Sequence, residues 1–431
     1  MSSSERSGVA ANLGWLLTDK LVRVLLTVVV GFWLARYLGP VRFGALSYAV
    51  ALVALLLPVA ELGLEMLIRR DFARSPADSA DLARTALGLR AGGAFAALGL
   101  LFVALALGLV PAAEVDLVLI IAISLFNPAL SVAEPWLQSR MESPRAMPLQ
   151  WLILSLGAGV RIWSISAGAP LATFAWIMAV ESIVVALALT LTGRRCGLRT
   201  GRFRGELART LMREAWPLTL LGVVTVIYMR IDVVMLRRIH GEAEVGVYAA
   251  ATRLVELTYM LPAALAVSLM PGLLRAKSDG PTAYLERFRQ YLDVSAAAAY
   301  LIIVPVTLLA PLVIRLAYGD DYAASAEVLR IQIWAALFVF LSLARGQFLI
   351  NAGLTRFYLA AAGAGAVANV ALNLVLIPRW GGVGAAYATV GSYAVASWLS
   401  SYFHAEVRPV GQLQTRALFV PITGWRWLRK H

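Results

Sequence analysis

Residues 213–271 read REAWPLTLLGVVTVIYMRIDVVMLRRIHGEAEVGVYAAATRLVELTYMLPAALAVSLMP. Two long apolar segments flank a short polar turn at residues 240–244, and each segment carries charge in its interior. The charged residues are Arg230 and Asp232 before the turn, and Arg253 and Glu256 after it. Because charge inside a membrane-length apolar helix is costly, it indicates either a functional site or an ion pair that joins helices.

The composition is that of a polytopic membrane protein. Of 431 residues, 60% are hydrophobic and only 15% are charged, whereas soluble domains have about 45–50% apolar and about 25% charged residues. The single cysteine, Cys196, excludes an intrachain disulfide, and the three scattered histidines form no metal-binding cluster. The phosphate-binding pattern GxxxxGKS/T does not occur, so we expect no ATP hydrolysis, no metal and no cofactor.

The apolar segments predict an all-α fold with about twelve transmembrane helices, since a spanning helix needs about 20 apolar residues. The predicted spans are 12–37, 44–68, 82–109, 115–138, 147–168, 170–192, 214–237, 244–272, 290–316, 325–350, 357–378 and 383–406. The one long polar segment divides them into two lobes of six helices. We predict an N-lobe at 1–192, a basic cytoplasmic linker at 193–213, a C-lobe at 214–406 and a basic cytoplasmic tail at 407–431.

The positive charges predict the orientation of the chain. Lys and Arg are concentrated in the segments that follow every second predicted span. Because positively charged loops stay in the cytoplasm, both termini are expected there. The basic run 194–213 is then a topology signal in contact with lipid headgroups, and we expect no nucleic-acid partner.

A short sequence repeat relates the two halves. The residues Arg36, Gly39 and Gly44 after the first span recur after the seventh at a constant offset of 202, as Arg238, Gly241 and Gly246. Glycine permits a tight turn and a close backbone approach. Six spans per half make the repeat parallel, which predicts a pseudo-twofold axis along the membrane normal and a cleft between the lobes.

The motifs around this repeat resemble bacterial polysaccharide flippases of the Wzx type, which belong to the MOP exporter superfamily. The resemblance is carried by LARYLGPVRFGALSY at 34–48, WPL at 216–218, YMRID at 228–232, VGVY at 245–248, YGDDY at 318–322 and NLVLIP at 373–378. It implies alternating access and a lipid-linked substrate, an undecaprenyl-pyrophosphate-linked oligosaccharide of O-antigen or exopolysaccharide biosynthesis. It also implies a monomer in the bacterial inner membrane, among lipids and near a polymerase and chain-length machinery.

Arg253 is the residue that the resemblance singles out. Lipid II flippases in the same superfamily use cationic residues in a central cavity to hold pyrophosphate. Their eighth span carries an arginine in a context similar to Ala251-Thr252-Arg253-Leu254. Their first-span arginines do not align cleanly with Lys20 and Arg23, which stay candidates.

The residues themselves leave two interpretations for Arg230 and Arg253. They lie 11 and 12 residues from Gly241, which at ~1.5 Å per residue puts both about 17 Å from the turn. They could therefore converge on one anionic group, which a planar guanidinium binds through paired hydrogen bonds. Alternatively, Arg253 and Glu256 are three residues apart and could neutralise each other.

Asp19, Lys20 and Arg23 form a second charged cluster in the first span. Asp19 and Arg23 are four apart and could pair, which leaves Lys20 as a cation near the cytoplasmic entrance. The cluster is thus a candidate entry site for phosphate. Carboxylates of this kind could alternatively couple transport to an ion gradient, and the candidates for that role are Asp19, Asp232 and Glu256.

Other intramembrane charges are expected to be structural. Arg90 and Arg161 would snorkel towards an interface, and Glu65 would pair with Arg69 one turn further on. Two other functions remain open. A cation-coupled multidrug antiporter of the same superfamily would have a cleft dominated by acids. A membrane glycosyltransferase or polymerase would carry carboxylates in a large outer loop, and no outer loop here is long.

Overall fold

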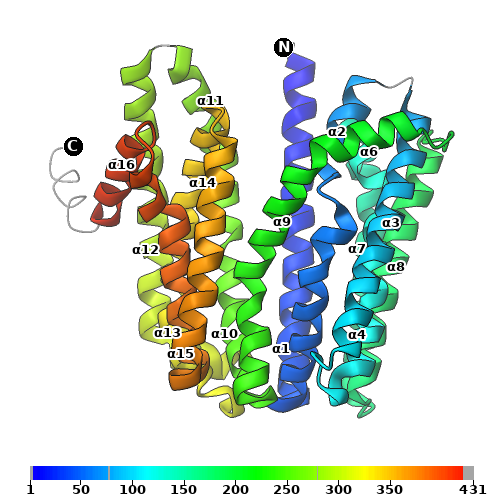
Figure 1. Cartoon of the computed structure of the whole chain (residues 1–431), viewed down its shortest axis with the longest axis vertical. Coiled ribbons are helices and arrows are strands. Elements are labelled where there is room, and N and C mark those ends of the chain that lie inside the picture. Colours follow the sequence, from blue (N-terminus) through cyan, green and yellow to red (C-terminus); the bar gives the residue numbers. More distant parts are fainter. Residues whose placement is uncertain (1–2, 76–77, 279, 421–431) are drawn as a thin grey trace. The chain divides into compact units, whose positions relative to one another are not determined.

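The computed structural model describes residues 3–75, 78–278 and 280–420, with the backbone alone described for residues 3–27 (Figure 1). Within those ranges every element is a helix, which confirms the predicted all-α fold. Nine helices of the described part are long and apolar enough to cross a membrane. Large apolar side chains on them are exposed, as on a surface that faces lipid. The chain is therefore a multi-pass membrane protein. The count of twelve spans stays a prediction.

The chain forms two compact units. Unit 1 comprises Met1–Leu38 and Ala45–Val226, and unit 2 comprises Gly39–Gly44 and Ile227–His431. Helix α9 (Gly205–His240) contributes its first part to unit 1 and its last part to unit 2. It begins inside the segment predicted as a linker, and α16 (Arg408–Leu418) lies in the predicted tail. The six-plus-six division of the helices stays a prediction.

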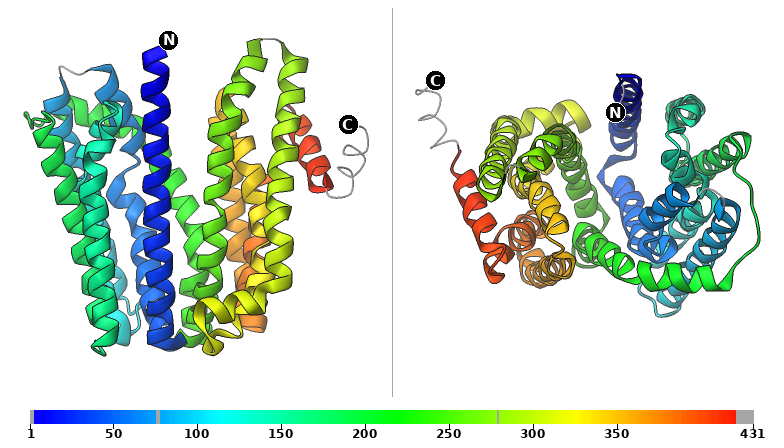
Figure 2. Two further views of the ribbon diagram at one scale, coloured as in Figure 1. Left: turned by 180° about the vertical axis from the view of Figure 1, so that it is seen from behind. Right: turned by 90° about the horizontal axis from the view of Figure 1, so that it is seen from above.

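Unit 1 is a helical bundle (Figure 2). Besides the first part of α9, its long helices include α1 (Ser3–Glu61), α3 (Ser79–Ala106), α7 (Ser143–Ser166) and α8 (Leu171–Arg195). The short α2 (Glu65–Arg74) follows α1. Backbone geometry at Gly39 (φ 69°, ψ 171°) interrupts α1 between the first two predicted spans. The second predicted span, 44–68, is too long at its end, because α1 ends at Glu61.

The predicted span 115–138 is wrong as a single helix. The structure has a chain of short helices there, η2 (Ala112–Glu114), α4 (Val115–Ala122), η3 (Ile123–Phe126), α5 (Asn127–Leu130) and α6 (Ala133–Ser139). Pro128 stands in the first turn of α5, and Pro135 lies in α6. Each proline removes a backbone N–H that a continuous helix would use, so hydrophobicity alone overestimates the length of the helix.

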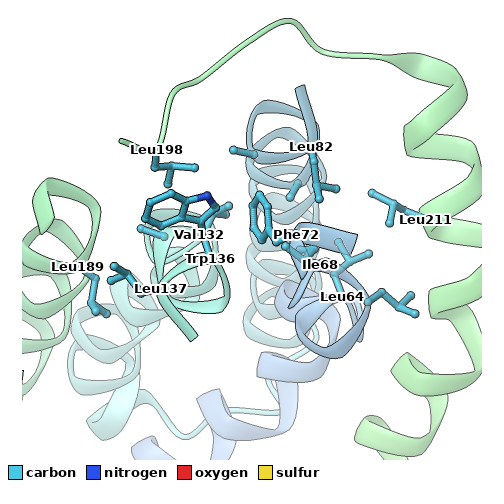
Figure 3. Packing of buried hydrophobic residues seen from close by; sticks show 14 of the residues in the cluster. Leu64, Ile68, Phe72, Leu82, Val132, Trp136, Leu137, Leu189, Leu198 and Leu211 are labelled. Carbon is cyan, nitrogen blue, oxygen red and sulfur yellow. The ribbon is translucent and has the colours of Figure 1, made fainter. Parts of the chain in front are cut away.

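The buried core of unit 1 lies where α2, α3 and α6 meet (Figure 3). Trp136 and Phe72 are almost fully buried in it, and leucine and isoleucine side chains surround them. The labelled aliphatic residues of Figure 3 are Leu64, Ile68, Leu82, Val132, Leu137, Leu189, Leu198 and Leu211. Leu211 comes from α9, so the start of that helix is fixed by hydrophobic burial in unit 1.

Unit 2 contains the end of α9 and all later helices. These are α10 (Glu242–Thr258), α11 (Met260–Ser278), α12 (Pro281–Tyr318), η4 (Asp320–Tyr322), α13 (Ser325–Gln332), α14 (Ala335–Asn351), α15 (Thr355–Ser397), η5 (Leu399–Phe403) and α16. Gly381 (φ 54°, ψ −131°) divides α15 between the last two predicted spans. The predicted span 244–272 is two helices, because Pro262 has no N–H to donate to the carbonyl of Thr258. The predicted span 325–350 is likewise two helices, α13 and α14.

The two repeated glycine turns have the same backbone shape. Gly39 (φ 69°, ψ 171°) and Gly241 (φ 90°, ψ −172°) both adopt a conformation that disfavours any residue with a Cβ. Their partners in the repeat allow close contact. A Cβ on Gly44 would lie 1.8 Å from the carbonyl oxygen of Glu242, and one on Gly246 would lie 2.0 Å from that of Pro40.

These two contacts are reciprocal at the offset of the repeat. Gly246 is the repeat equivalent of Gly44, and Glu242 is the repeat equivalent of Pro40. The contact of Gly44 with Glu242 therefore has the same form as the contact of Gly246 with Pro40. The turn at 39–44 and the start of α10 therefore cross through a local twofold arrangement inside unit 2. The repeat predicts this local geometry, while a symmetry axis for the whole chain stays a prediction.

Reporter fusions test the topology of α12. With 38 residues the helix is about 57 Å long, so it is long enough to cross a hydrocarbon layer of about 30 Å. Fusions after Lys277 and after Asp320 are expected to report opposite sides, with Lys277 in the cytoplasm. Alkaline phosphatase and green fluorescent protein activities measure this, and the same side for both would contradict the twelve-span topology.

Candidate functional site

Unit 2 holds an ion pair between α9 and α10. Arg230 Nη1 lies 2.9 Å from Glu256 Oε1, and Nη2 donates a longer hydrogen bond of 3.4 Å to Oε2. The two side chains are 31% and 27% exposed. Glu256 is thus paired across helices with Arg230 and not along α10 with Arg253. A half-exposed ion pair at this position in the spans requires contact with water or with polar groups.

Arg253 has a different environment. Its guanidinium carbon lies 4.7 Å from the centroid of the Phe43 ring, and among the residues that the structure describes it forms no ion pair. Phe43 is fully buried and packs on Tyr318 and Tyr322, with ring centroids 6.5 and 6.0 Å away. A cation–π contact contributes about 0.5–2 kcal/mol but leaves the positive charge uncompensated. Arg253 can therefore still bind an anion.

Asp232 is bound by a buried polar network. It is 2% exposed and accepts hydrogen bonds from the Tyr248 hydroxyl and from the Val233 N–H. The Tyr248 oxygen also accepts a bond from Gln332 and lies 3.2 Å from the Thr389 hydroxyl. The network joins α9, α10, α13 and α15. Asp232, whose partner the sequence could not predict, is thus held by Tyr248.

Three tyrosines gather beside the ion pair. Tyr228 precedes Arg230 on α9, Tyr259 follows α10, and Tyr393 lies on α15. The Tyr393 ring is 5.1 Å from that of Tyr228 at 78° and 6.2 Å from that of Tyr259 at 44°. The sequence does not predict this cluster, because the three residues come from separate parts of the chain. The one available signal was the position of Tyr228 and Tyr259 next to intramembrane charge.

The first-span cluster cannot be placed in this site. Asp19, Lys20 and Arg23 belong to the backbone of α1, and their side chains lie outside the described residues. Their proposed roles in phosphate entry and ion coupling therefore stay predictions.

Unit 1 pairs the intramembrane arginines Arg90 and Arg161 with carboxylates. The predicted snorkelling is wrong for the buried Arg90 and stays a prediction for Arg161. Arg90 is 1% exposed; it donates 2.7 Å to Glu65 Oε2 and 3.0 Å to the Pro128 carbonyl. Arg161 of α7 pairs with Glu181 of α8. A carboxylate on another helix neutralises a buried arginine inside the membrane. The position of the arginine in the sequence does not indicate this partner. Glu65 pairs with Arg90, not with Arg69 as predicted.

The helical architecture of the described residues is similar to that of solved membrane transporters. Three solved structures share the fold. The lipid II flippase MurJ, in an inward closed conformation, is 14% identical over 95% of this chain and 91% of that chain, with a TM-score of 0.74. A MOP superfamily transporter from Pyrococcus furiosus is 14% identical over 96% of each chain, with a TM-score of 0.63. An outward-facing MATE multidrug resistance transporter is 17% identical over 96% and 97%, with a TM-score of 0.61.

The chain belongs to the polysaccharide biosynthesis protein family, whose model matches residues 9–277. This confirms the family that the sequence motifs predicted. The MatE family model matches residues 217–375. No curated protein matches the chain by sequence.

Proposed function

We propose that the protein is a flippase that moves an undecaprenyl-pyrophosphate-linked oligosaccharide from the cytoplasmic to the outer leaflet by alternating access. It works in the bacterial inner membrane with both termini in the cytoplasm. The translocated lipid-linked oligosaccharide then passes to a polymerase and chain-length machinery. In this proposal the chain is a transporter and not an enzyme, and it acts as a monomer.

The observation that carries the proposal is the uncompensated charge of Arg253. The diphosphate of the substrate is anionic and strongly hydrated, so its passage through hydrocarbon requires a cationic surface. A guanidinium binds phosphate oxygens through two parallel hydrogen bonds and stays charged. Arg253 has its charge available, whereas Arg230 shares its charge with Glu256. We therefore assign the pyrophosphate to Arg253, with Arg230 beside it and Lys20 and Arg23 at the entrance.

The energy source is proposed to be an ion gradient, the membrane potential or removal of the product. Candidates for coupling are Asp19, Asp232 and Glu256. The structure describes the side chains of Asp232 and Glu256. Asp232 is the more enclosed of the two, since the Tyr248 hydroxyl and the Val233 N–H donate hydrogen bonds to its carboxylate. Displacing Tyr248 would expose that carboxylate to a cation or a proton.

A cation-coupled multidrug antiporter is the second candidate function. The match of the MatE family model to residues 217–375 favours it. The two functions differ in substrate charge, because an antiporter for cationic drugs would keep acids free in its cleft. In unit 2, Glu256 is paired with Arg230, and Asp232 is hydrogen bonded. These contacts favour the anionic lipid.

Depletion of the protein separates the two functions. We expect depleted cells to lose surface polysaccharide and to accumulate lipid-linked oligosaccharide that a membrane-impermeant glycosidase cannot reach from outside. Drug susceptibility should stay unchanged. Thin-layer chromatography of extracted lipids and growth in cationic drugs measure the two effects. Increased drug sensitivity with normal polysaccharide would instead establish the antiporter.

A further inference from the structure

Three side chains of α10 and its C-cap follow one another along the helix and change in chemical character. Arg253, Glu256 and Tyr259 are each three residues apart, so neighbours in the series lie close on the helix surface. Each step is about 4.5 Å along the axis. Going away from the Gly241 turn, the series presents first a free cation, then an ion pair, then an aromatic ring.

Neighbouring helices extend the second and third steps of this series. Arg230 of α9 supplies the partner of Glu256, and Tyr228 lies two residues before it. The Tyr228 and Tyr259 rings both contact Tyr393 of α15. Three tyrosine rings from separate elements thus adjoin one half-exposed arginine–glutamate pair, all within unit 2.

This combination of groups matches the surface of a sugar ring. A pyranose has faces of C–H groups, which pack against aromatic rings, and a rim of hydroxyls, which donate and accept hydrogen bonds. An arginine offers up to five N–H donors and a carboxylate offers acceptors for such hydroxyls. Ligand sites in general combine an aromatic lining with a few fixed polar groups. Tyr228 and Tyr259 pack against the buried Tyr393 in one hydrophobic cluster, and both remain partly exposed at its edge.

We propose that the Arg230–Glu256 pair and the tyrosines 228, 259 and 393 form a saccharide subsite, which binds the sugar next to the pyrophosphate. This inference rests on the proposed flippase function and names the part of the substrate that these residues bind. The order of groups along α10 fixes the order of the ligand. The pyrophosphate lies at Arg253, and the first sugar lies one to two helical turns further towards Tyr259.

Binding measurements on the purified full-length protein test the subsite. The probes are undecaprenyl pyrophosphate without sugar and the same lipid carrying glucose, galactose or N-acetylglucosamine, with affinities measured by native mass spectrometry. We expect the wild type to bind at least one glycosylated probe more tightly than the bare lipid. Tyr228→Ala and Tyr259→Ala should weaken that binding about tenfold. The bare lipid should bind both variants within about twofold of the wild type.

Matched variants separate a binding role from a packing role. Tyr228→Phe keeps the ring and should retain the preference for the glycosylated lipid. Tyr387→Ala removes an exposed tyrosine from the same helix as Tyr393 and should change neither affinity. Thermal unfolding of each variant identifies any that fail to fold.

Three results would overturn the subsite. They are equal binding of all probes by the wild type, a retained sugar preference in both alanine variants, and an equal loss of the bare and glycosylated lipids in those variants. The last would mean that the rings only pack helices together. Failure of the wild type to bind any of the pyrophosphate lipids would instead refute the flippase function itself. Arg253→Ala serves as the reference, because it should lose both kinds of lipid.

Discussion

Arg253→Ala is expected to abolish surface polysaccharide while the protein remains in the membrane at its normal level. The Arg253 guanidinium lies over the Phe43 ring and has no carboxylate partner among the described residues. Arg230, by contrast, is paired with Glu256, and Arg345 donates a hydrogen bond to the end of α15. If Arg253 binds the pyrophosphate, its removal takes away the strongest attraction for the substrate. Charge-assisted bonds to a phosphate contribute more than neutral hydrogen bonds, so transport should fall below detection.

The same substitution should cost little stability. The variant loses one cation–π contact with Phe43, which contributes at most about 2 kcal/mol. It also removes a partly buried charge, whose desolvation opposes folding. Loss of transport without loss of protein is therefore the signature of a binding role, and a merely structural role would reduce both together.

Whole-cell measurements check this prediction. Surface polysaccharide is measured by gel electrophoresis of cell-surface extracts, and membrane protein by immunoblot of a tagged chain. Arg379→Ala is the control, since Arg379 is an exposed arginine at the end of the first half of α15. It should leave polysaccharide unchanged. Normal polysaccharide in Arg253→Ala cells would refute the cationic site.

The sequence predicts the turns of this fold better than the partners of its charges. The offset of 202 identified the glycines at 39, 44, 241 and 246, and all four have the conformation or the close contact that the repeat requires. A requirement for glycine can be predicted from a short stretch of sequence, because it depends on the backbone conformation at a single residue. Helix ends were predicted less well, as at Pro262, where a missing N–H divides an apolar run.

Ion pairs could not be predicted, because their partners are distant in the chain. Spacing rules apply only to neighbours on one helix. By spacing, an ion pair between Arg253 and Glu256 was possible. The structure instead joins Arg230 to Glu256 and Arg90 to Glu65, which are separated by 26 and 25 residues. The choice of partner depends on which helix faces turn towards each other. That information arises from packing, so the availability of Arg253 emerged only in three dimensions.

Gly44→Ala is expected to destabilise the protein strongly, and Gly246→Ala should do the same. A methyl group at either position would meet a backbone carbonyl oxygen at 1.8 or 2.0 Å. The backbone cannot move aside as a flexible side chain can. The loss of stability should therefore exceed the value usual for overpacking, which is about 1–3 kcal/mol. Gly44 also follows Phe43, so the shift would disturb the ring beneath Arg253.

The control for these variants is Gly363→Ala in α15. Gly363 has nothing within 4 Å of its would-be Cβ, and its backbone is helical. Alanine there should raise stability by up to about 1 kcal/mol, because glycine is the poorer helix former. Thermal unfolding of the detergent-solubilised protein measures all three variants. A melting temperature for Gly44→Ala as high as that of Gly363→Ala would contradict the close contact.

The double variant Gly44→Ala/Gly246→Ala tests the reciprocity itself. Both methyl groups would be accommodated by one movement, which separates the turn at 39–44 from the start of α10. Once the first methyl has forced that separation, the second meets less resistance. The loss of stability should therefore be clearly smaller than the sum of the two single losses, as for residues that share a contact. If the two losses simply add, the contacts are independent, and the turn and α10 do not cross through a shared local twofold.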